Sequence, residues 1–132
     1  MPVRVLYVED NAMNRQVVRD MLDVAGASMT EAIDAEAGLK AVQEQEFDIV
    51  LMDVRMPGMD GLTAVKEMRK MPAPICNLPV IVVTADTSAD LRERCEAVKA
   101  DDVIMKPVAL QELLSSMGRV LAQGKGADIV LD

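Results

Sequence analysis

Acidic, hydroxyl and basic side chains follow the apolar runs of this sequence, and together they could carry out phosphoryl chemistry. In chain order they are Glu9, Asp10, Asp53, Thr84 and Lys106. Three carboxylates that are held close together repel one another unless they are protonated or bridged by a cation. Because the ligand atoms on offer are hard oxygens, the set favours Mg²⁺ over zinc, with Mn²⁺ as an alternative.

Asp53 is the expected nucleophile of this set, since it stands alone after the central apolar run. A carboxylate, a divalent metal and a lysine are the minimal requirements for forming an aspartyl phosphate. The Lys106 ammonium offers a positive charge to phosphate oxygens, and Thr84 offers a hydroxyl donor. For any one of these residues, a solvated charge at a strand end is the more frequent explanation. The hypothesis therefore depends on all five residues lying together.

The apolar runs predict the strands that position these side chains. They are almost continuously apolar and rich in β-branched residues, as is typical of strands buried on both faces. These runs are residues 3–8, 49–52, 80–83 and 103–105, and the more polar residues 28–32 predict an edge strand. In a doubly wound sheet, ligands bind at the carboxyl ends of the strands, which is where the polar residues would meet.

Helical periodicity separates the predicted strands. Gly26 is expected to end the first helix, Asp34 to begin the second, and Thr87 or Ser88 to begin the fourth. Strands that alternate with helices predict an α/β fold of five (βα) units, with a parallel sheet and helices on both faces. We expect one domain over residues 1–122, followed by a tail or linker stump at 123–132 in which residues 129–131 could form a docking strand.

Composition and charge exclude several classes of function. With 132 residues the chain has the size of one domain, and its net charge of −8 argues against nucleic-acid binding. The absence of histidine excludes Ser–His triads, His-ligated zinc and a phosphohistidine on this chain. Two cysteines form no disulfide framework, and there is no apolar run of transmembrane length and no signal peptide. We therefore expect a cytoplasmic location and no membrane contact.

Four separate blocks resemble the receiver domains of two-component response regulators, most closely those of hybrid histidine kinases. The blocks are Val-Glu-Asp-Asn at 8–11, Asp-Val-Arg-Met-Pro-Gly-Met-Asp-Gly at 53–61, Val-Thr-Ala at 83–85 and Met-Lys-Pro at 105–107. The resemblance extends over residues 3–122 and implies a flavodoxin-like (CheY-like) fold with strand order 2-1-3-4-5. It also implies a regulator, not an enzyme, that assists its own phosphorylation and dephosphorylation.

The resemblance further implies a role for each matching residue. Asp53 would accept the phosphoryl group, while Thr84, Ala85 and Lys106 would bind it and take part in the switch. Magnesium would be held by Glu9, Asp10, Asp53 and the backbone carbonyl of Arg55, and the peptide bond before Pro107 would be cis. The phosphoryl donor would be a histidine kinase or a histidine phosphotransfer protein. Docking candidates on the first helix are Met13, Asn14 and Val17.

Two positions depart from the pattern of the family, and a pair of charged residues is expected beside the phosphorylation site. Val103 stands where receivers usually carry an aromatic residue, which suggests that the aromatic rotamer switch is absent. Lys99 stands where a glycine is common, so the turn there is either remodelled or tolerates an unfavourable backbone conformation. Arg55 and Asp86 could pair beside the phosphorylation site and hinder attacking water, although two solvated loop charges are the favoured interpretation.

Three other functions fit the sequence less well. A haloacid-dehalogenase-type hydrolase needs a second acid two residues after its nucleophile, where this chain has Arg55. A flavodoxin-like flavin binder needs hydroxyls and amides in its first loop, where Glu9 and Asp10 would repel a phosphate. A pseudo-receiver that serves only as an interaction scaffold stays open as the alternative. Open too are the cognate kinase, the output, phosphorylation-dependent homodimerisation, and whether the domain stands alone or belongs to a hybrid kinase.

Overall fold

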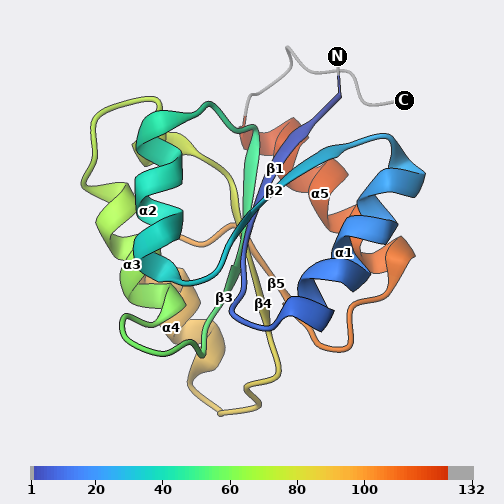
Figure 1. The fold of residues 1–132 in the computed structure, drawn as a ribbon. Helices are drawn as coiled ribbons and strands as arrows, with labels where there is room; N and C mark the ends of the chain where they lie inside the picture. Colours follow the sequence, from blue (N-terminus) through green and yellow to red (C-terminus); the bar gives the residue numbers. More distant parts are fainter. Residues whose placement is uncertain (1, 125–132) are drawn as a thin grey trace.

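Five strands form a parallel sheet in the order β2-β1-β3-β4-β5 in the computed structural model, which describes residues 2–124 (Figure 1). The predicted fold class and strand order are confirmed. The strands are β1 (Arg4–Val8), β2 (Ser28–Ala32), β3 (Ile49–Asp53), β4 (Val80–Thr84) and β5 (Asp102–Met105). Every residue of β3 and β4 is buried, as expected for strands covered on both faces. Strand β5 begins at Asp102, one residue before the predicted apolar run at 103–105.

Helices cover both faces of the sheet. Helices α1 and α5 lie on one face, and α2, α3 and α4 lie on the other (Figure 1). Their bounds are α1 Ala12–Ala25, α2 Ala35–Glu44, α3 Gly61–Arg69, α4 Leu91–Ala97 and α5 Leu110–Gly124, with a short 3₁₀ helix, η1, at Ile75–Asn77. Helix α5 continues two residues past position 122, and the docking strand suggested at 129–131 lies outside the described residues.

Two of the predicted helix ends are confirmed, and one is wrong. Gly26 ends α1 in the left-handed conformation, with φ 78°, and the Asp34 carboxylate begins α2 by accepting the Ala37 amide at 2.8 Å. Helix α4, however, begins only at Leu91, and its N-cap Asp90 makes no side-chain capping bond. Ser88 is not available as a cap because its backbone amide donates to the Asp86 carboxylate at 2.8 Å, and its hydroxyl bonds the same oxygen.

The turn at Lys99 keeps the unfavourable backbone conformation instead of being remodelled. Lys99 has φ 62°, which costs a residue with a side chain about 1 kcal/mol. The Arg69 guanidinium fixes this turn by donating to the Lys99 carbonyl at 2.7 Å and to the Leu78 carbonyl at 2.6 Å. These hydrogen bonds from a charged donor offset the backbone cost at the amino-terminal edge of the sheet, away from the predicted site.

Candidate functional site

The carboxyl ends of four strands bring the predicted polar residues to one edge of the sheet. Thr84 ends β4, and its carbonyl accepts the backbone amide of Lys106 at 2.9 Å, which ties the lysine to the neighbouring strand. Asp53 ends β3 and pairs with Val83 in the register of the sheet. Because parallel strands share one carboxyl edge, residues far apart in the sequence become neighbours here. The peptide bond between Lys106 and Pro107 is cis.

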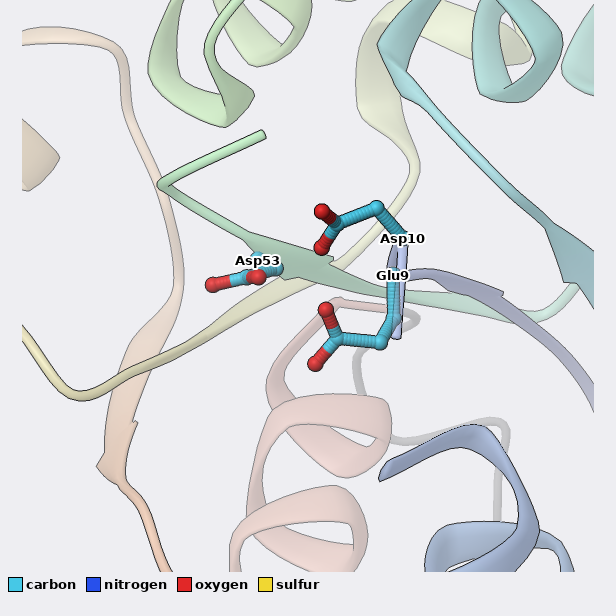
Figure 2. Close-up of side chains that lie close together, drawn as sticks. All are labelled: Glu9, Asp10 and Asp53. Atoms are coloured by element: carbon cyan, nitrogen blue, oxygen red, sulfur yellow. The ribbon is translucent and has the colours of Figure 1, made fainter. Parts of the chain in front are cut away.

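Glu9, Asp10 and Asp53 form an acidic cluster at this edge (Figure 2). One oxygen from each carboxylate lies within 4.8 Å of the others, and among the residues that the structure describes this is the one group with metal-ligating spacing. Glu9 and Asp53 are buried and Asp10 is exposed, so the cluster opens to solvent on one side. An all-oxygen set of this kind fits Mg²⁺, which keeps several of its own waters when it binds protein carboxylates.

Lys106 is the cation that neutralises the buried part of the cluster. Its ammonium Nζ lies 2.6 Å from Glu9 Oε1 and 3.3 Å from Asp53 Oδ2, and 19% of its side chain is exposed. Burial alone would lower the pKa of this lysine, but the two carboxylates outweigh that effect and raise it. Lys106 therefore stays charged, and its ammonium is placed to pair with an oxygen of any group that becomes attached to Asp53.

Burial and the repulsion between like charges give the two buried carboxyls, Asp53 and Glu9, very different pKa values. Burial raises the pKa of Asp53 to about 7, and the neighbouring Glu9 adds to the shift. Burial also disfavours the charged form of Glu9, but hydrogen bonding with Asp53 and with Lys106 brings its pKa to about 2. Glu9 thus carries the negative charge of the pair at neutral pH, whereas Asp53 is protonated in only a fraction of the molecules, and a metal ion must displace that proton.

This distribution of charge and proton between Glu9 and Asp53 predicts that metal binding depends on pH. Below about pH 7 each Mg²⁺ bound must release the proton of Asp53, so the affinity is expected to fall by about tenfold per pH unit and to level off above that pH. The same raised pKa means that Asp53 binds more protons in the metal-free folded protein than in the unfolded chain, so the contribution of Asp53 to stability falls as the pH rises from about 4 to 7. Amide NMR titrations with MgCl₂ at several pH values test the first effect. An affinity that does not change with pH, or a slope that persists in Asp53→Asn, would contradict the assignment.

The threonine and its neighbours form the rim of the site. Thr84 is buried, and its hydroxyl oxygen accepts the backbone amide of Asp86 at 3.0 Å. Ala85 is exposed between them. Val103 is half-buried on β5 and packs against the apolar cluster that includes Leu91 of α4. Val103 is therefore a strand residue that packs against apolar neighbours.

Arg55 and Asp86 form an ion pair, contrary to the favoured interpretation of two solvated charges. Arg55 Nη2 lies 3.5 Å from Asp86 Oδ2, with 75% of the arginine side chain exposed but only 5% of the aspartate side chain. Sequence reasoning failed on Asp86 because it could not show that Ser88 and Arg94 fold over this carboxylate. Hydrogen bonds from Ser88, and then the two arginines, hold the pKa of Asp86 well below its usual range.

Sequence analysis missed Tyr7 as a residue of the site, and it named Asn14 only as a docking candidate and not as a partner of Glu9. The Tyr7 hydroxyl donates to Glu9 Oε1 at 3.2 Å, and the Asn14 side-chain amide donates to the same oxygen at 3.0 Å. Strand periodicity carried a usable signal, because Tyr7 and Glu9 are two positions apart and so share one face of β1. Met13, one of the docking candidates, is 76% exposed on α1. Val17, one turn along, is also exposed.

A doubly wound sheet that carries buried carboxylates, a lysine and a threonine at its carboxyl edge defines a class of phosphoryl- and cation-binding α/β domains. Comparison with known proteins specifies the family. The model of the response regulator receiver domain matches residues 5–117, and the chain belongs to this family, the phosphoacceptor domains of two-component phosphorelays. Among the described residues, no helix is long and apolar enough to cross a membrane.

Individual relatives agree with this assignment. The chain is 34% identical over 116 residues to the sensory/regulatory protein RpfC of Xanthomonas campestris, and 36% identical over 121 residues to the response regulator MprA of Mycolicibacterium vanbaalenii. These alignments cover 87% and 92% of the chain, which spans 16% of the length of RpfC and 51% of that of MprA. The receiver domain of the sensor histidine kinase PA1611 from Pseudomonas aeruginosa, solved with magnesium in its active-site cleft, superposes with a TM-score of 0.84 at 31% identity, covering 92% of this chain and 99% of that one.

Proposed function

We propose that Asp53 is the phosphoacceptor of this receiver domain and that Glu9, Asp10 and Lys106 provide the charges that its phosphorylation requires. The observation that carries the proposal is the position of Asp53: it is buried at the end of β3, within reach of both the Lys106 ammonium and the acidic cluster. The backbone carbonyl of Arg55, two residues beyond Asp53, completes the proposed set of Mg²⁺ ligands, and Mn²⁺ is the expected substitute.

The transfer itself needs little covalent chemistry from the protein. A carboxylate oxygen of Asp53 forms a bond to phosphorus, and the bond from phosphorus to the donor nitrogen breaks, leaving its electron pair on that nitrogen. A bound divalent ion neutralises the charge that collects on the phosphoryl oxygens. Lys106, 3.3 Å from Asp53 Oδ2, is placed to pair with one such oxygen, and the Thr84 hydroxyl to donate to another.

We further propose that the donor is the phosphohistidine of a histidine kinase or histidine phosphotransfer protein. The chain has no histidine of its own, so the donor must be a second molecule or another domain. The exposed side chains of Met13 and Val17 flank Asn14 on α1 beside the site and offer an apolar contact for that donor. Under this proposal the domain acts as a regulator and not as an enzyme with a substrate of its own.

The function is tested by the intact mass of the protein after incubation with phosphoramidate, a small donor with a phosphorus–nitrogen bond. We expect a gain of one phosphoryl group that requires MgCl₂ and is absent in Asp53→Asn. Asp60→Asn is the matched control, because Asp60 is an exposed carboxylate that caps α3 and should not affect the gain. No gain under any condition would favour an unphosphorylated interaction scaffold.

The Arg55–Asp86 ion pair is expected to slow the hydrolysis of the phosphoryl group on Asp53, compared with a variant that lacks the arginine. Arg55 follows Asp53 by two residues and is paired with a buried carboxylate, so its side chain is expected to obstruct the water that attacks phosphorus. Arg55→Ala should therefore shorten the phosphoryl lifetime by about threefold, as is appropriate for a largely exposed charge. The decay of the phosphorylated mass after removal of the donor measures the lifetime. Lys66→Ala, an exposed cation on α3, serves as control. A lifetime equal to that of the wild type would contradict the prediction.

A further inference from the structure

Three donors converge on a single oxygen of Glu9. Oε1 accepts the Tyr7 hydroxyl at 3.2 Å, the Asn14 side-chain amide at 3.0 Å and the Lys106 ammonium at 2.6 Å. The other oxygen, Oε2, accepts the backbone amide of Asn11 at the longer distance of 3.4 Å. Three donors saturate the acceptor capacity of Oε1, whereas Oε2 keeps lone pairs free for another ligand.

Neither Tyr7 nor Asn14 has a role in the phosphoryl chemistry described above. Tyr7 is fully buried among the apolar residues beneath α1 and α5, and it is the only tyrosine of the chain. A buried hydroxyl needs a hydrogen-bond partner, and this one finds it in the carboxylate two residues ahead on the same strand face. Asn14 approaches from α1, whose first turn is fixed by the bond from the Asn14 amide to the Asn11 side chain at 2.9 Å.

The two donors determine which way the Glu9 carboxylate faces. Because Oε1 is held from β1 and from α1, the carboxylate cannot turn about its last side-chain bond without losing these hydrogen bonds, and Oε2 retains acceptor capacity for a cation. The same arrangement keeps Lys106 against Oε1, within reach of Asp53. Partners that orient a metal ligand are typically worth about 10- to 100-fold in metal affinity.

We propose that Tyr7 and Asn14 are positioning residues of the phosphorylation site: they fix Glu9 so that Oε2 faces the cation and Oε1 retains Lys106. The inference rests on the proposed function for the identity of the cation, but it concerns residues that the proposed chemistry does not use. It predicts that Tyr7→Phe and Asn14→Ala each weaken Mg²⁺ binding by about tenfold.

The test is an amide NMR titration of each variant with MgCl₂, combined with the rate of mass gain from phosphoramidate. Both variants are also made in the Glu9→Ala background, where their effect on the Mg²⁺ midpoint should disappear, because they act only through Glu9. Gln16→Ala removes another amide side chain from α1, and Ser116→Ala removes another buried hydroxyl, so these are the matched controls and should bind Mg²⁺ like the wild type.

Several outcomes would overturn the inference. Unchanged Mg²⁺ midpoints in both variants would do so, and so would an equal loss of affinity in the Glu9→Ala background, which would indicate a general structural effect. If Tyr7→Phe fails to fold, as its thermal unfolding would show, the half-exposed Asn14 decides the question alone. A wild-type protein that binds Mg²⁺ but gains no phosphoryl group would contradict the proposed function, while the Mg²⁺ titrations would still judge the roles of Tyr7 and Asn14.

Discussion

Replacing Lys106 with alanine is expected to slow phosphorylation of Asp53 by at least about 100-fold, the effect of removing one preorganised donor from a charged transition state. Two effects add together. The phosphoryl oxygens lose their ammonium partner, and Asp53 loses the cation that holds its pKa down against burial and Glu9. A larger fraction of Asp53 is then protonated at neutral pH and unable to attack phosphorus.

The time course of intact mass with phosphoramidate and MgCl₂ measures the effect of Lys106→Ala. Lys40→Ala is the control, since Lys40 is an exposed cation on α2. Glu9 loses its closest partner in the variant, so the fold is verified by its thermal unfolding before the rates are compared. A rate within about twofold of the wild type, in a folded variant, would show that Lys106 is a structural counter-ion only.

Gly61→Ala is expected to destabilise the protein by about 3 kcal/mol or more, because overpacking against backbone cannot be relieved by a side-chain rotation. A Cβ on Gly61 would lie 1.8 Å from the Asp53 carbonyl oxygen and 2.9 Å from Met52 Cγ. The Gly61 amide also donates to the Val54 carbonyl at 2.9 Å, which holds α3 against the end of β3. The substitution would therefore displace the residue that is proposed to accept the phosphoryl group.

Urea denaturation measures this loss of stability. Gly26→Ala is the matched control: Gly26 has φ 78° but nothing within 4 Å of the added Cβ, so only the backbone penalty of about 1 kcal/mol applies. Gly61→Ala is thus expected to be clearly the less stable of the two variants. If it proved as stable as Gly26→Ala, the close approach of α3 to the end of β3 would be wrong.

The sheet was predictable because its strands are defined by local composition. Continuous apolar runs of β-branched residues are typical of strands with both faces covered, and the polar residue that ends each run marks the carboxyl edge. Asp53, Thr84 and Lys106 could therefore be predicted to lie together from topology alone, although the first and the last are 53 positions apart in the sequence.

Contacts between loops could not be predicted in the same way. Ser88 is of a residue type that commonly caps helices, but its side chain binds Asp86. Helix α4 therefore begins at Leu91, three residues after Ser88. Asp86 is of a residue type that is usually solvated in a loop, but Arg94 of α4 contacts it, with 3.2 Å between Arg94 Nη2 and Asp86 Oδ2. Such contacts depend on where a helix lies in space. One sequence gives no periodic signal for them, whereas it does for the strands.

The phosphoryl group is expected on Asp53, and the most direct test is to locate the residue that carries it. Borohydride reduces an aspartyl phosphate to homoserine and releases phosphate, so reduction after phosphorylation marks the residue permanently. Peptide mass mapping is then expected to find homoserine at position 53, only when both MgCl₂ and phosphoramidate were present. Homoserine at another acidic residue, such as Asp10 or Asp86, or none at any position after full exposure to the donor, would contradict the account.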